Sequence, residues 1–88
     1  MKQISWQDKK KAITIDCNNY FNPEGFERLC DAIDSGALVH CYISCIGFTR
    51  AHREGYNYYE ALKKKYGASV IYYIYEETYY NKYYFKLK

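Results

Sequence analysis

The chain has 88 residues, which suffice for one domain with a modest core and are too few for two domains. Its formal charge of +3 permits an anionic partner, although dedicated nucleic-acid domains are usually more basic. We therefore predict a single compact domain over residues 1–88.

The composition also argues against a membrane or exported protein. No apolar run approaches the roughly 20 residues of a membrane span, and the N-terminus lacks the apolar stretch of a signal peptide. We expect a cytoplasmic protein whose four cysteines are reduced thiols. The ten lysines against three arginines, with abundant Tyr, Ile and Asn, are typical of AT-rich codons. They indicate a low-GC bacterium, or a phage or mobile element living in one.

Two short extended segments begin the chain. They are Lys2 to Trp6 and Lys11 to Cys17, and the polar residues 7–10 between them suit a tight turn. This pattern predicts an N-terminal β-hairpin. Alternate residues from Ile13 to Cys17 are expected to face the core.

The next element carries the signals of an amphipathic helix. Asn22 provides an N-cap, Pro23 suits the first helical position, and Gly36 suits a left-handed C-terminal cap. An apolar stripe at helical spacing runs from Phe26 to Ile33. The solvent flank is acidic, and we expect it to contact a protein. Its acidic residues are Glu24, Glu27, Asp31 and Asp34.

A strand and a second helix follow. Residues 38–48 are mostly apolar or β-branched and predict a central strand. Residues 49–66 repeat with helical period, and Gly67 is placed to end this helix. Glycine is unfavourable inside a helix. An alternative is therefore a helix that begins only after Gly55, with residues 49–55 forming a loop before it.

The last twenty residues, Ser69 to Lys88, hold seven of the thirteen tyrosines and predict a β-hairpin that turns within residues 76–82. The predicted order is thus β-β-α-β-α-β-β. This order is typical of an α/β (α+β) two-layer sandwich, with a mixed sheet of four or five strands and two helices packed on one face.

The other face of such a sheet is uncovered, and we expect it to bind a macromolecular partner. Tyrosine is enriched at interface hot spots because it offers a large contact area and a hydroxyl that tolerates water. The residues expected on this binding surface are His40, Tyr42, Tyr73, Tyr75, Tyr84, Lys86 and Lys88.

The leading hypothesis is a small non-enzymatic interaction protein whose partner is a protein. Phage and mobile-element inhibitors of host defence complexes, anti-CRISPR proteins among them, are often of this size and apparent origin. The alternative is a module that stacks single-stranded RNA or DNA on its tyrosines beside lysines. Two uncovered faces could also pair in a homodimer.

A second alternative is a small ribonuclease-type toxin. His52 between Arg50 and Arg53 could act on a phosphodiester, although a solvated basic helix surface is the favoured interpretation of these residues.

No cofactor or metal is expected. Cys41 and Cys45 in one strand lie about 13 Å apart, and His40 points to the opposite face, so the three cannot share a zinc ion.

Overall fold

The computed structural model describes residues 1–44, 47–78 and 81–88. Within them the strands form one five-stranded mixed sheet in the order β1-β4-β5-β3-β2. The strands are β1 (Lys2–Gln3), β2 (Ile13–Asp16), β3 (Val39–Tyr42), β4 (Val70–Glu76) and β5 (Asn81–Leu87). The helices are α1 (Trp6–Lys9), α2 (Pro23–Asp34) and α3 (Phe48–Tyr66), followed by a 3₁₀ turn, η1 (Gly67–Ser69).

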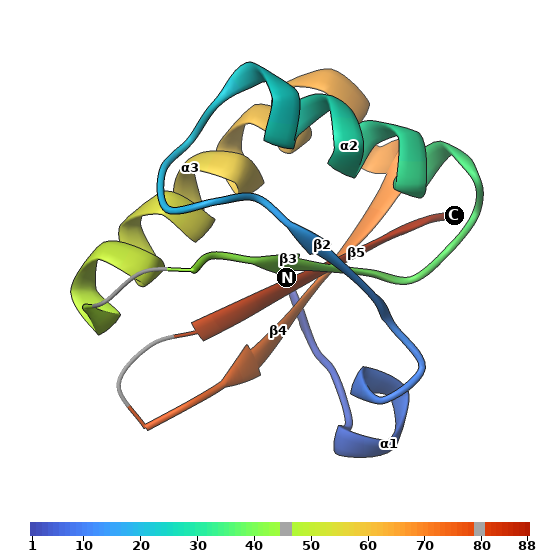
Figure 1. Ribbon diagram of the computed structural model, residues 1–88. Coiled ribbons are helices and arrows are strands. Elements are labelled where there is room, and N and C mark those ends of the chain that lie inside the picture. Colours follow the sequence, from blue (N-terminus) through green and yellow to red (C-terminus); the bar gives the residue numbers. More distant parts are fainter. Residues whose placement is uncertain (45–46, 79–80) are drawn as a thin grey trace.

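The predicted sandwich is confirmed. The two long helices, α2 and α3, lie together on one face of the sheet (Figure 1). β4 and β5 form the antiparallel C-terminal hairpin, and β5 also pairs antiparallel with β3. The hairpin strands end at Glu76 and resume at Asn81, so the turn falls inside the predicted range of residues 76–82.

The N-terminal hairpin was wrongly predicted. β1 pairs in parallel with β4 and β2 pairs in parallel with β3, so the two segments lie at opposite edges of the sheet. Residues 7–10 are not a hairpin turn. Residues 7–9 belong to the one-turn helix α1, and Lys10 is its C-cap. The helix is capped at its N-terminus because the Ser5 hydroxyl oxygen accepts the Asp8 N–H at 3.1 Å.

This topology forces the connection from β1 to β2 across the sheet. α2 and α3 occupy one face, and the connection with α1 lies on the other (Figure 1). We call residues 4–12 the crossing segment. Its first residue is tied to the sheet, because Ile4 is buried and its N–H donates to the Ile74 carbonyl at 2.9 Å.

Both long helices follow their sequence signals, and Gly55 has a packing role. α3 runs through this glycine without interruption, so the alternative later start is wrong. A Cβ at Gly55 would lie 3.1 Å from the Tyr83 ring, so the glycine lets α3 approach β5 closely. Asn22 caps α2 by accepting the Gly25 N–H at 2.7 Å, and Gly36 ends it with a φ of 88°.

The core lies between the helices and the sheet. Its largest fully buried side chains include Leu29, Tyr58 and Phe85. Cys17 and Cys41 are buried there as free thiols with their sulfurs 3.6 Å apart. Burial raises the pKa of the Cys41 thiol well above its usual value, so this thiol stays neutral and unreactive. Cys45, which belongs to the zinc argument above, lies outside the described residues.

Candidate functional site

Three of the predicted binding residues form a row across the sheet face opposite α2 and α3. Tyr73 of β4 lies beside Tyr84 of β5, which lies beside His40 of β3. The rings of His40 and Tyr84 are stacked with centroids 4.7 Å apart. Thr14 of β2 extends the row, because its Oγ1 lies 3.4 Å from His40 Nδ1. The register of three strand pairs therefore brings these side chains together.

The centre of this row is covered, contrary to the expectation of an open face. Tyr84 is 1% exposed and His40 is 8% exposed, so neither offers a surface to a partner. The physical reason is the crossing segment, which passes over this face from one sheet edge to the other (Figure 1). Lys9 of that segment places its ammonium 4.2 Å from the centre of the Tyr75 ring.

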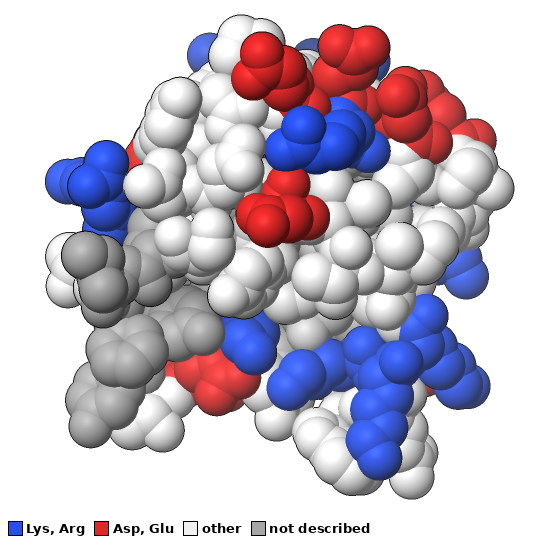
Figure 2. Space-filling view, in the orientation of Figure 1, with Lys and Arg blue, Asp and Glu red and all other residues white. Residues whose placement is uncertain are grey.

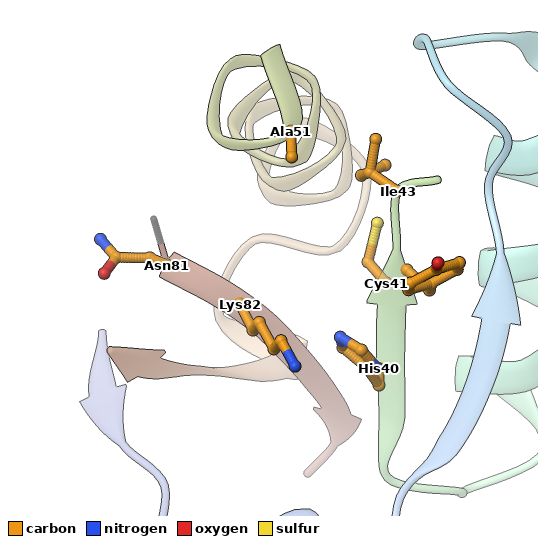
Figure 3. Close-up of a pocket in the computed structure, with 7 residues that line it drawn as sticks. His40, Cys41, Ile43, Ala51, Asn81 and Lys82 are labelled. Carbon is orange, nitrogen blue, oxygen red and sulfur yellow. The ribbon is translucent and has the colours of Figure 1, made fainter. Parts of the chain in front are cut away.

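His40 has the chemistry of a buried structural histidine. Burial, assisted by the nearby Lys82 and Lys9 charges, lowers its pKa from 6.5 to about 4. The imidazole is therefore neutral at physiological pH. In Figure 3 the Lys82 and His40 side chains point toward each other, whereas Cys41 points toward the α3 side.

The pocket in that view is too small for a ligand. Its volume is about 20 Å³, which is space for a water molecule and little more. The residues that line it are His40, Cys41, Tyr42, Ile43, Ala51, Asn81 and Lys82.

The exposed aromatic rings on this side of the sheet match those the sequence indicated only in part. Tyr42 keeps 44% of its surface exposed, whereas Tyr73 and Tyr75 are half-buried. Trp6 of α1 is 55% exposed, and the Lys10 ammonium lies 3.6 Å from the centre of its ring. Sequence reasoning missed Trp6 as a contact residue because it placed it in a strand; the Ser5-x-x-Asp8 cap was the signal for a helix.

Lysines lie near these rings: Lys10 lies over the Trp6 ring, and Lys82 lines the same small pocket as Tyr42. Lys9 and Lys82 share the Glu77 carboxylate at 4.0 and 3.2 Å, while Lys86 and Lys88 are exposed. Figure 2 shows Lys and Arg side chains gathered over and beside α1. We call this the basic surface. Its residues are Trp6, Lys9, Lys10, Lys11, Tyr42, Lys82 and Lys86.

The acidic flank predicted on α2 lies on the other side of the molecule. In Figure 2, Asp and Glu side chains gather along this helix, away from the basic surface. Glu24, Glu27 and Asp31 are exposed. Asp34 is also exposed, but its Oδ1 accepts the Tyr66 hydroxyl at 2.8 Å, which joins α2 to α3. The predicted contact residues therefore fall into two separate surfaces of opposite charge.

The residues of the ribonuclease alternative lie on the first turns of α3. Arg50, His52 and Arg53 are all exposed there. The neighbouring carboxylate, Glu54, is buried and accepts the Phe21 N–H at 3.3 Å. Glu54 is thus engaged in holding the loop before α2 rather than in orienting a catalytic base.

In the described part of the chain, no three His, Cys, Asp or Glu side chains are grouped closely enough to hold a metal ion. Of the helices in residues 1–44, 47–78 and 81–88, none combines the length and apolar character that a bilayer span requires.

Comparisons with known proteins found no matching family model, no matching curated protein and no matching solved structure.

Proposed function

We propose that the protein is a small non-enzymatic binding protein that holds a macromolecular partner, a protein, through the basic surface. The observation that carries this proposal is the pairing of exposed aromatic rings with lysines on one side of the molecule. Trp6 and Tyr42 are 55% and 44% exposed. The Lys10 ammonium lies over the Trp6 ring, and Lys82 lines the same small pocket as Tyr42. Trp and Tyr are the residues most enriched among interface hot spots.

The energetics favour burial of Trp6 by a partner. Covering roughly 100 Å² of its exposed ring contributes on the order of 2.5 kcal/mol at about 25 cal/mol per Å². The lysines add attraction toward an acidic protein and accelerate its association. The acidic flank of α2 gives the opposite side the opposite sign, so the charges also orient the protein in a complex.

The composition narrows the class of partner. A codon-driven excess of Lys over Arg, with many Tyr and Ile, is typical of a low-GC bacterium or of a phage or mobile element living in one. The partner to test first is therefore a host defence complex, with this chain as its inhibitor in the manner of anti-CRISPR proteins.

Single-stranded nucleic acid is the second candidate partner. One observation favours it: the exposed rings of Trp6 and Tyr42 lie beside lysines, and unpaired bases stack on such rings. Binding of this kind weakens steeply with salt because each phosphate contact releases counterions.

The test is capture from nuclease-treated lysate of a low-GC host, with contacts mapped by crosslinking. We expect one protein complex to be retained and to crosslink to the crossing segment, and Trp6→Ala to reduce capture about tenfold or more. The control is Tyr56→Ala, which removes an exposed tyrosine from α3 on the other face. Equal capture by the wild type and Trp6→Ala would refute the proposal. Capture that disappears with nuclease would favour the nucleic-acid alternative.

A further inference from the structure

A cleft opens between the crossing segment and the sheet. Its volume is about 300 Å³. The crossing segment contributes Ile4, Asp8 and Lys11, and the remainder of the lining is Leu38, which precedes β3, Tyr73 of β4 and Lys86 of β5. The cleft therefore exists because the connection from β1 to β2 passes over the face instead of turning back as a hairpin.

The charged groups of the cleft form no ion pairs among the described residues. Among the described residues, Asp8, Lys11 and Lys86 make no ion pair, whereas Lys9 and Lys82 nearby both pair with Glu77. Two ammonium groups at one cleft with a single carboxylate leave a local excess of positive charge. Such a site attracts an anion.

The remaining lining residues are aliphatic and aromatic. Ile4 and Leu38 supply aliphatic surface, and Tyr73 supplies an aromatic ring whose hydroxyl makes no hydrogen bond within the described residues. A volume of about 300 Å³ is at the lower limit of small-molecule sites, so it excludes a dinucleotide and admits a mononucleotide.

We propose that this cleft binds a nucleoside monophosphate. Lys11 and Lys86 hold the phosphate, because ammonium groups donate charge-assisted hydrogen bonds to phosphate oxygens. The base lies against Ile4, Leu38 and the Tyr73 ring. The Asp8 carboxylate accepts an N–H or O–H from the base or ribose. The cleft shares Lys11 and Lys86 with the basic surface, but a free nucleotide tests it without any protein partner.

The test is calorimetric titration of the full chain with AMP at low salt, beside adenosine and ribose 5-phosphate. We expect saturable binding of AMP and much weaker binding of either fragment. Lys11→Gln and Lys86→Gln should each weaken AMP binding about tenfold or more, the effect of losing a charged hydrogen bond. The matched control, Lys64→Gln, removes an exposed lysine of α3 and should leave it unchanged.

The result that overturns the proposal is absence of saturable AMP binding, or binding that none of the cleft substitutions changes. A single-stranded RNA added as competitor identifies the natural source of the nucleotide. Displacement of AMP by the RNA assigns the cleft to a nucleotide within a strand, and retention of AMP assigns it to a free nucleotide.

Discussion

Burial of His40 beneath the crossing segment predicts that the protein loses stability in mild acid. Its pKa falls from 6.5 in the unfolded chain to about 4 in the fold, mainly because burial disfavours the charged imidazole. Below pH 6.5 the imidazole of His40 is protonated in the unfolded chain, whereas in the folded protein it stays neutral until the pH approaches 4. The stabilisation that comes from the neutral His40 is therefore fully present above pH 6.5. The free energy of unfolding declines as the pH falls from 6.5 toward 4.

The size of this loss follows from the two pKa values. They differ by about 2.5, which corresponds to on the order of 3 kcal/mol once the pH reaches 4. Between about pH 7.5 and pH 5.5, where carboxylates contribute little, the loss is about 1.3 kcal/mol. That is a large fraction of the stability of a small domain.

The assay is urea denaturation followed by circular dichroism at several pH values. His40→Phe keeps a ring against Tyr84 but cannot titrate, so its stability should vary much less over this range. His52→Asn is the matched control, because it removes the exposed histidine and should keep the wild-type pH dependence. A wild-type stability that is flat from about pH 7.5 to 5.5, or a His40→Phe protein with the same slope, would refute the burial of His40.

Two further substitutions test the packing that supports the site. Tyr58→Phe removes the hydroxyl that accepts the Asn22 N–H at 3.1 Å, and leaving that buried donor unpaired should cost about 1–3 kcal/mol in thermal or urea denaturation. Tyr59→Phe should change stability by less than about 0.5 kcal/mol, and equal losses in the two would contradict this assignment. Gly55→Ala places a Cβ 3.1 Å from the buried Tyr83 ring, so we expect destabilisation of about 1 kcal/mol despite the better helix propensity of alanine. A more stable Gly55→Ala protein would mean that the ring has room to move.

The crossing segment changes how the tyrosine-rich face works. Tyr84 and His40, which were expected to contact a partner, are buried and stack on each other inside the protein. The same segment leaves the Trp6 side chain exposed to solvent and forms one wall of the cleft that Lys11 and Lys86 line. Partner binding and nucleotide binding are both assigned to features that exist only because this segment covers the sheet.

The amino-acid sequence by itself determined the elements whose signals are local. Asn22 and Gly36 marked the ends of α2, and the tyrosine-rich alternation after Ser69 marked the C-terminal hairpin with its turn within residues 76–82. These predictions hold because a cap, a turn or an amphipathic period depends on residues within a few positions of one another. The two-layer arrangement followed from the order of the elements.

Only the tertiary structure decided which strands pair and which surfaces remain exposed. β1 and β2 are neighbours in the sequence, yet they do not pair with each other. Their backbone N–H and C=O groups are paired by β4 and β3, at opposite edges of the sheet. A pattern of alternating residues reports that a strand has two faces, but it does not report what covers each face. Burial of Tyr84, exposure of Trp6 and the cleft between them depend on that long-range pairing, which local sequence signals do not contain.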